Sequence, residues 1–345
     1  MKINMREIIK LLLIIHVILL SGCGDDENKS EDKSESESVI PYNEGSKKIS
    51  DVNFDGSNHL FLATNGLIID RDIDTGNEEI IFDAGTFHEY SPSDFVISSI
   101  NSTDSYVYFI LGIKQNVNSR PSGKYIYQYD RNSKAMRLLA SPNAEENTPY
   151  FDSITINEAG DTLYSIHIEH EWPAEYTNIN KIDIETGNKE LLASFQIAPP
   201  YGDNEKELYQ IAMDEKNNRI IGFGTDDEND IIIYTFDISG ESNKFEQLSH
   251  CPIGVESYSI TFSPLNNTLY AVIYDENDLF NIKNPALYEI VPETCSLTLL
   301  VDATDIIDHH WYYNNKGIDF NFQTRDLYLS HFNYNLDTRK FSFRK

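Results

Sequence analysis

The chain has 345 residues, of which 40% are hydrophobic and 24% are charged, and its formal net charge is −29 at pH 7. A surface this acidic repels phosphate backbones and anionic headgroups, which excludes nucleic acid as a partner and leaves cations, basic peptides and neutral glycans as candidate ligands. The length fits either two ordinary domains or one large all-β domain.

The first 22 residues have the organisation of a secretory signal peptide. Three Lys or Arg residues accompany an apolar run over 8–20, which is shorter than the roughly 20 residues needed to span a bilayer. The run ends in Leu-Ser-Gly-Cys at 20–23, which resembles the lipobox of bacterial lipoproteins. The resemblance implies that Cys23 carries diacylglycerol and palmitate and anchors an exported protein in the cell membrane or outer membrane, facing the periplasm or the exterior. An ordinary signal peptide with an incidental cysteine is the alternative.

Residues 23–38 are predicted to form a disordered acidic tether. The segment from Gly24 to Ser38 has seven acidic residues, two lysines and no apolar side chain. It therefore has too little apolar surface to offset the entropy lost on ordering. The folded domain is expected over 39–345.

A strand–turn–strand phrase recurs along this domain. In "INKIDIETGNKELLASF", from Ile179, two short apolar strands flank a turn with Asp, Thr and Gly. Asp can accept hydrogen bonds from the backbone two residues on, and Gly tolerates a positive φ, so both residues favour a tight turn. Related phrases begin at Gly66, Lys124, Asp230 and Ala286.

A second recurring phrase precedes each of these, as in "ITINEAGDTLY", and predicts two more strands per repeat. The repeats are about 53 residues apart, a period typical of propeller blades. The phrases resemble those of TolB-like and YncE-like propellers, which implies an all-β, six-bladed β-propeller of four-stranded antiparallel blades, with seven blades as the alternative. The predicted units are 49–84, 93–140, 150–194, 206–249, 255–301 and 314–345.

The last predicted unit has only three clear strands before Lys345. In a propeller, the other end of the chain commonly supplies such a missing outer strand, because the ring must close to hide its edges. We therefore expect the fourth strand to come from Ser38–Tyr42 or from the segment after Lys47.

One face of the predicted propeller carries short turns, and the other carries long, variable connections. Function concentrates in long loops on a rigid scaffold. Aromatic residues with interspersed acids and histidines suit a glycan, a peptide or a cation, although many such aromatics simply cap the ends of blades. The candidate binding residues of this long-loop face are Glu89, Tyr90, Tyr150, His170, Trp172, Tyr176, Tyr201, His309, His310, Trp311, Tyr312 and Tyr313.

Two acidic patterns are weak candidates for Ca²⁺, and no other cofactor is predicted. Asp70, Asp72 and Asp74 alternate as in a calcium loop, but the Gly comes one place late and an apolar residue replaces the bidentate Glu. The repeat explains the same residues as a strand face entering a turn. Asp227 and Asp230 belong to a second cluster of carboxylates, in a predicted loop.

Cys251 and Cys295 lie in the predicted propeller, and an oxidising compartment favours their pairing. The blade register, however, places Cys251 at the long-loop face and Cys295 in a turn at the opposite face. A strand of five or six residues separates these faces by about 17–20 Å, against a Cα–Cα limit of about 7 Å for a disulfide. The sequence therefore predicts that they do not pair. Cys295 also replaces the glycine of Gly76 and Gly187, which suggests a differently built turn.

The sequence contains no nucleophile elbow, no His-Glu-x-x-His motif and no phosphate-binding Gly-rich loop with Lys. The leading hypothesis is therefore a membrane-anchored propeller that acts as a binding or assembly module through its long-loop face. A hydrolase or lyase that acts on a glycan or lactone from the axial mouth of the propeller, with or without a metal, is the alternative, because carboxylates and histidines occur in the same loops. A purely structural component of the cell envelope is a third hypothesis.

Overall fold

The computed structural model describes the chain between residues 51 and 343, with gaps. The predicted signal peptide, Cys23 and the tether lie outside the described residues. Among the residues that are described, no helix is both long enough and apolar enough to cross a membrane. The described segments are 51–64, 66–87, 95–113, 124–141, 150–171, 174–198, 207–226, 230–239, 245–254, 257–263, 266–274, 286–302, 318–321, 326–329, 332–335 and 340–343.

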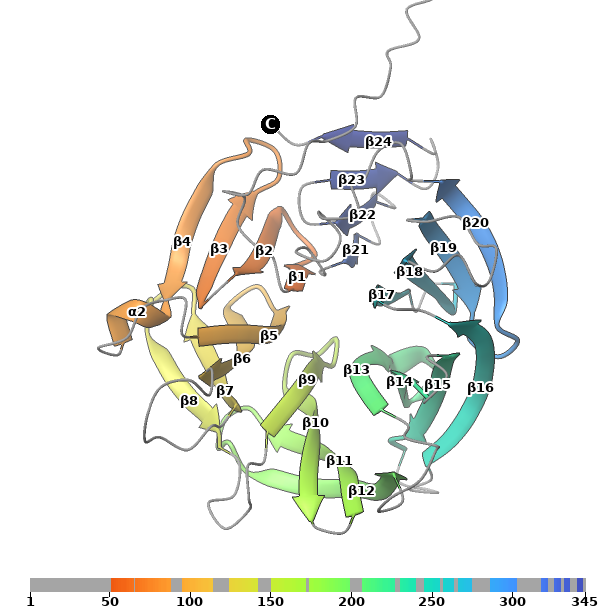
Figure 1. The fold of residues 1–345 in the computed structure, drawn as a ribbon. Coiled ribbons are helices and arrows are strands. Elements are labelled where there is room, and N and C mark those ends of the chain that lie inside the picture. The colour runs from red at the N-terminus through yellow and green to blue at the C-terminus, as the bar shows by residue number, and fades with distance from the viewer. Residues whose placement is uncertain are drawn as a thin grey trace, which may run out of the picture. The chain divides into compact units, whose positions relative to one another are not determined.

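Antiparallel strands dominate these segments, and their sheets are arranged around a central axis (Figure 1). The first sheet has the strand order β1-β2-β3-β4 and is followed by the short helix α2. The bounds are β1 (Asp51–Phe54), β2 (His59–Thr64), β3 (Leu67–Asp72), β4 (Glu78–Asp83) and α2 (Ala84–Phe87).

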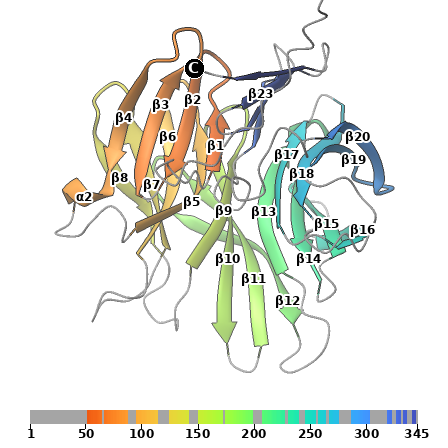
Figure 2. The same cartoon turned by 45° about the horizontal axis from the view of Figure 1, so that its top comes forward.

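The second sheet has eight strands, in two antiparallel runs of four. The runs are joined where β7 and β9 pair in parallel through Lys124 and Tyr150, and Lys124 Nζ donates to Asp152 Oδ1 at 2.6 Å across this junction. The long strands β10 and β11 extend side by side (Figure 2). The bounds are β5 (Phe95–Ser102), β6 (Tyr106–Ile113), β7 (Lys124–Asp130), β8 (Met136–Ala140), β9 (Tyr150–Ile156), β10 (Thr162–Glu171), β11 (Ala174–Asp183) and β12 (Lys189–Ala198).

Three further four-stranded sheets complete the described fold, each with its strands paired in sequence order. One short 3₁₀ helix, η2 (Glu215–Asn217), lies between β13 and β14. The bounds are β13 (Glu207–Asp214), β14 (Arg219–Thr225), β15 (Asp230–Asp237), β16 (Phe245–Gly254), β17 (Ser257–Ser263), β18 (Thr268–Tyr274), β19 (Ala286–Val291), β20 (Ser296–Asp302), β21 (Asp319–Asn321), β22 (Asp326–Leu329), β23 (Phe332–Asn335) and β24 (Lys340–Phe343).

The predicted class, an all-β propeller of four-stranded antiparallel blades, is confirmed, but the predicted number of blades is wrong. The described strands form five hydrogen-bonded sheets, neither the six predicted from the repeats nor the seven kept as the alternative. The difference arises because the second and third predicted units share the eight-stranded sheet, through the parallel contact of β7 with β9.

The expected donation of a strand by the other end of the chain is also wrong. The last sheet contains its own outer strand, β24, paired with β23 from Phe332↔Phe343 to Asn335↔Lys340. The ring closes instead by packing between β1 and the last sheet. The rings of Phe54 and Tyr328 lie 5.4 Å apart, and both side chains are buried in one apolar cluster.

In the first sheet, burial is greatest in the second strand and falls toward the outer strand, which explains the composition of these strands. In β2, five of the six residues are buried, because the strand is covered on both faces by neighbouring strands and sheets. In the outer strand β4 only Phe82 is fully buried. Apolar clusters fill the space between successive sheets, such as the cluster that joins β14 and β15 to β17, β18 and β19. These interfaces hold the ring together.

The four fully described turns between third and fourth strands share one backbone conformation. Gly76, Lys134, Gly187 and Cys295 all have φ between 54° and 75°. The amides of Gly76, Gly187 and Cys295 each donate to the carbonyl four residues back, at 2.8–2.9 Å. The expectation that the turn at Cys295 is built differently is therefore wrong. The same left-handed conformation is therefore adopted by glycine, which has no steric penalty there, and by Lys134 and Cys295, which have one.

These turns pack against the outer strand of the preceding repeat. A Cβ added at Gly187 would lie 2.3 Å from the Leu139 carbonyl oxygen in β8. At the equivalent position, Lys134 Nζ donates to Glu79 Oε1 in β4 at 2.9 Å. Each of these two turns therefore contacts a residue within the outer strand of the preceding repeat, near the end of β8 in one case and near the start of β4 in the other.

Replacing Gly187 with Ala is expected to lower the free energy of unfolding by about 3 kcal/mol, because a left-handed alanine and a clash with a backbone carbonyl add together. Gly56→Ala is the matched control. Gly56 has φ +81°, but nothing lies within 4 Å of its added Cβ, so it should lose only about 1 kcal/mol. Urea unfolding of both variants measures the difference, and equal losses would contradict the close packing of this turn.

The same packing overturns the prediction for the cysteines. Cys251 and Cys295 form a disulfide with a Cα–Cα distance of 5.2 Å. Cys295 occupies the turn position of Gly187, and Cys251 lies in β16, the outer strand of the preceding sheet, where it pairs with Ile231. Ser249 Oγ also donates to the Pro292 carbonyl at this contact. Cys295 lies in the predicted turn, but Cys251 does not follow the outer strand as predicted. It lies within β16, which continues to Gly254, and there it meets the turn of the next sheet.

Candidate functional site

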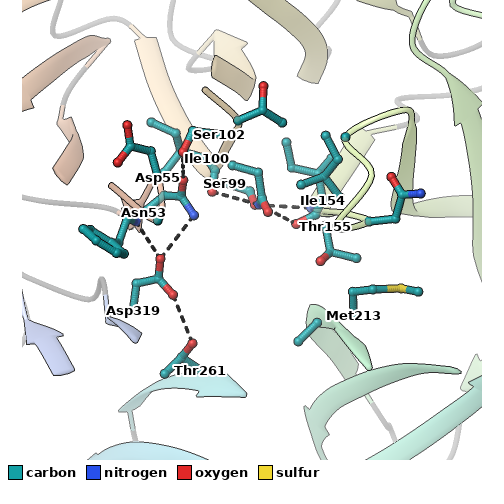
Figure 3. Close-up of a pocket in the computed structure, with 18 of the residues that line it drawn as sticks. Asn53, Asp55, Ser99, Ile100, Ser102, Ile154, Thr155, Met213, Thr261 and Asp319 are labelled. Carbon is teal, nitrogen blue, oxygen red and sulfur yellow. Dashed lines mark hydrogen bonds between the residues drawn. The ribbon is translucent and has the colours of Figure 1, made fainter. Parts of the chain in front are cut away.

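A polar cavity of about 720 Å³ lies on the axis of the propeller, where the first strands of the sheets meet (Figure 3). Residues of β1, β5, β9, β13, β17 and β21 line it. The turns after the first strands, such as Asp55–Gly56 and Asn157–Gly160, complete the lining. Because the first strand of every sheet ends at the same side of the ring, the cavity lies toward the face with short turns.

Side chains around the cavity link the innermost strands of successive sheets or runs. In three repeats, the residue before the buried Val or Ile of the inner strand accepts a hydrogen bond from the backbone amide of the next inner strand. The amides of Ile100, Ile154 and Ile211 donate to Asp51 Oδ2 (2.8 Å), Ser99 Oγ (3.2 Å) and Ser153 Oγ (3.2 Å), respectively.

Asp319, from the last sheet, connects three sheets (Figure 3). Its Oδ2 accepts hydrogen bonds from the Phe54 amide at 2.6 Å and from Asn53 Nδ2 at 3.2 Å, both in β1. Its Oδ1 accepts a bond from Thr261 Oγ1 of β17 at 3.3 Å. One carboxylate therefore joins the C-terminal sheet to the N-terminal sheet and to β17.

The charge of the cavity is entirely negative among the described lining residues, which include no Lys, Arg or His. Low-dielectric walls focus the field of such a cleft and favour cationic or hydrogen-bonding ligands over anions. The carboxylates in the lining are Asp51, Asp55, Asp104, Glu158, Glu215 and Asp319.

Two of these carboxyl groups have opposite protonation behaviour. Burial raises the pKa of Asp51 to about 7, although the amides of Ile100 and Val52 donate to it, and the negative charge of Asp319 adds to this shift. Burial also disfavours the charged form of Asp55, but hydrogen bonds from Ser57, His59 and Arg131 outweigh it and lower the pKa of Asp55. The Arg131–Asp55 pair has an N–O distance of 2.8 Å.

Most residues of the predicted long-loop face lie outside the described residues. The exceptions are strand residues: Tyr150 begins β9, His170 lies in β10, and Tyr176 lies half-buried in β11. The predicted loop around them is largely the β10–β11 hairpin. The structure therefore leaves that face a prediction. The other members, Glu89, Tyr90, Trp172, Tyr201, His309, His310, Trp311, Tyr312 and Tyr313, are not described.

Two of the weak calcium candidates have partners within the protein. Asp70 Oδ1 lies 2.7 Å from His59 Nδ1, and Asp72 Oδ1 accepts bonds from the Thr75 amide and hydroxyl at 2.7 and 2.9 Å. Asp74 is exposed in the same turn. Of the second cluster, Asp227 lies outside the described residues, and Asp230 begins β15.

The sequence interpretation placed the alternative enzyme site at the axial mouth, but it identified none of the residues that line the cavity, because it ranked loops by length. A signal was nevertheless present, since a polar residue directly precedes an isoleucine in "SSINS", "DSITI" and "YQIAM". This position repeats in register with the blades and points to polar groups along the inner strands.

No family model matches the chain, and neither does any curated protein. Solved structures do match. The propeller domain of Cps50 (Swd1) from Myceliophteria thermophila is 13% identical, with a TM-score of 0.50, and the match covers 88% of this chain and 84% of that one.

An oligogalacturonate lyase from Vibrio parahaemolyticus is 12% identical, with a TM-score of 0.45, and covers 82% of this chain and 85% of its own. A hydrazine synthase chain from Kuenenia stuttgartiensis is 10% identical, with a TM-score of 0.46, and covers 88% and 98%, respectively. At these identities the likeness concerns the fold alone. Proteins with unrelated functions share the propeller scaffold, so function has to be argued from the site.

Proposed function

We propose that this chain is a lipid-anchored, extracytoplasmic propeller that acts as a binding module and takes a small ligand into its axial cavity. The observation that carries the proposal is an axial cavity of about 720 Å³ with six carboxylates and no described basic side chain in its lining. This volume is in the range of small-molecule sites. The favoured ligand is a cation such as a polyamine or the basic side chain of a peptide.

Isothermal titration of the full-length protein in detergent tests the charge preference. Spermidine should bind more tightly than a neutral oligosaccharide, and a polyanionic oligosaccharide should not bind. Replacing both Asp104 with Asn and Glu158 with Gln, at the cavity mouth, should weaken spermidine binding about fivefold, since partly exposed charges each contribute up to about 1 kcal/mol.

The matched control is the double variant Asp74→Asn and Glu185→Gln, which also removes two negative charges, but from exposed blade turns away from the cavity lining. It should bind spermidine as the unaltered protein does. Equal weakening by both double variants would mean that the overall charge, and not the cavity, attracts the ligand.

A hydrolase that acts on a neutral glycan is the second candidate. The observation in its favour is Asp51, because a carboxyl group with a pKa of about 7 suits general acid or base catalysis at neutral pH. Glycan turnover that disappears in Asp51→Asn while spermidine binding persists would favour this candidate over the binding module.

The long-loop face is a second candidate binding surface. Its support is the aromatic composition of the loops. The combined replacement of Trp172, Trp311 and Tyr312 with Ala should then reduce peptide or glycan binding, whereas a ligand held in the cavity should be unaffected.

Replacing Cys23 with Ser is expected to move the protein from the membrane fraction to the soluble fraction, because two or more acyl chains give stable anchoring that a polar N-terminus cannot. Cell fractionation with mass spectrometry of the N-terminal peptide measures this. Cys251→Ala, which leaves the predicted lipobox intact, is the control and should stay in the membrane fraction. Membrane association of Cys23→Ser equal to that of the unaltered protein would contradict the lipid anchor.

A further inference from the structure

Three side chains with metal-ligating atoms converge where β14 ends, β15 begins and β16 passes alongside. Asp226 directly follows β14, Asp230 is the first residue of β15, and His250 lies in β16 opposite Ile232. Each residue offers one ligand atom, and the three atoms lie within 4.8 Å of one another. Two carboxylates from the ends of β14 and β15 thus lie beside one imidazole from β16.

The backbone fixes this arrangement. The Asp230 amide donates to Asp226 Oδ1 at 2.9 Å, and the Asp226 amide donates to the Asp230 carbonyl at 3.2 Å. His250 Nε2 lies 2.9 Å from Asp226 Oδ2 and 3.3 Å from Asp230 Oδ2. One oxygen of each carboxylate is therefore directed toward the same imidazole nitrogen.

The site combines buried acids with an accessible imidazole. The side chains of Asp226 and Asp230 are 11% and 8% exposed, whereas that of His250 is 45% exposed. Two carboxylates largely removed from water stabilise the fold only if positive charge compensates them. His250 is the member of the group that remains in contact with solvent.

We propose that Asp226, Asp230 and His250 bind a divalent metal ion of the Zn²⁺ class. In a tetrahedral Zn²⁺ site with bonds of about 2.0–2.2 Å, neighbouring ligand atoms are roughly 3.3–3.5 Å apart. The 3.3 Å distance from His250 Nε2 to Asp230 Oδ2 matches this spacing, and the 2.9 Å distance to Asp226 Oδ2 is shorter, so this pair has to separate slightly around an ion. An imidazole with two carboxylates suits Zn²⁺ or a similar transition metal. The described residues offer three ligands, fewer than the six to eight oxygens that Ca²⁺ takes.

This site is separate from the proposed binding function, because none of its three residues lines the axial cavity. It shares Asp230 with the weak cation candidates of this loop and adds Asp226, whereas Asp227 lies outside the described residues. With three protein ligands, the fourth position of a tetrahedral ion is open to water or to a ligand atom from another molecule.

Zn²⁺ titration of the full-length protein, after removal of metals with a chelator, tests the proposal. Co²⁺ as a spectroscopic probe should give the intense visible absorption of a tetrahedral site. His250→Ala should weaken Zn²⁺ binding by more than about 100-fold, because even the loss of an outer-shell partner costs 10- to 100-fold. Asp230→Asn should do the same without removing the imidazole.

His59→Ala is the matched control, because His59 pairs with a single carboxylate, Asp70, at 2.7 Å. It should leave both the Zn²⁺ affinity and the Co²⁺ spectrum unchanged. Circular dichroism of each variant verifies that it is folded. If the unaltered protein takes up no Zn²⁺, or if His250→Ala and Asp230→Asn bind it as the unaltered protein does, the three residues form only an ion pair and the proposal is overturned.

Discussion

Replacing Cys251 and Cys295 together with Ala is expected to lower the free energy of unfolding by about 4 kcal/mol. The disulfide closes a loop with a sequence separation of 44 residues, and the loop-closure entropy of a loop of this size corresponds to about 4 kcal/mol at 25 °C. Urea unfolding of the oxidised protein, the reduced protein and the double variant measures the effect. The reduced protein should resemble the double variant.

A third variant separates the disulfide from the backbone conformation of the turn. Cys295 has φ +54°, and glycine occupies the equivalent positions 76 and 187. In the Cys251→Ala background, Cys295→Gly should therefore be more stable than Cys295→Ala by about 1 kcal/mol. Equal stability of the oxidised and reduced proteins would contradict the cross-link, as would a non-reducing peptide map without a joined Cys251–Cys295 peptide.

The cysteines mark the limit of what the repeat pattern predicts. Strand order and turn positions follow from the pattern, because apolar alternation and Asp–Thr–Gly chemistry act locally. Where an outer strand ends, and which turn of the next repeat it meets, does not, since both depend on how neighbouring sheets pack. The close approach of Gly187 to Leu139 and the bridge from Cys295 to Cys251 are two contacts of this kind.

The number of sheets and the closure of the ring could not be predicted either, because both depend on contacts between parts of the chain that are far apart in sequence. The contact of Lys124 with Tyr150, which merges two repeats into one sheet, depends on how two sheets approach each other. Likewise, β24 was missed because its alternation of polar and apolar residues covers only the four residues Lys340–Phe343. The residues that line the cavity were missed for a related reason, since they belong to inner strands and short turns and not to long loops.

The polar residues that line the cavity also contribute to the stability of the fold. Asp51, Ser99 and Ser153 each accept an amide of the next sheet or run, and Asp319 joins the two ends of the chain's ring. Two of the carboxyl groups in the lining, Asp51 and Asp319, therefore also link the innermost strands of neighbouring sheets. A ligand that neutralises them should stabilise the folded protein by mass action.

Asp51→Asn is expected to abolish much of the pH dependence of stability between pH 5 and pH 8. The folded-state pKa of Asp51 is raised from 3.8 to about 7, so the folded protein retains a proton that the unfolded chain releases. Stability from this group is therefore full below about pH 4 and is lost as the pH rises to about 7, by roughly 4 kcal/mol in all and roughly 2.5 kcal/mol between pH 5 and pH 8.

Urea unfolding at pH 5, 6.5 and 8 measures this slope. The variant lacks the titrating carboxyl group, so relative to the unaltered protein it should gain about 2.5 kcal/mol between pH 5 and pH 8. The histidines titrate in both proteins and largely cancel in this difference. Asp319→Asn should flatten the slope in part, because the negative charge of Asp319 contributes to the raised pKa of Asp51. Asp74→Asn, at an exposed turn, should leave the slope unchanged. If Asp51→Asn and the unaltered protein have parallel pH profiles, Asp51 ionises normally and the axial cavity carries its full negative charge at neutral pH.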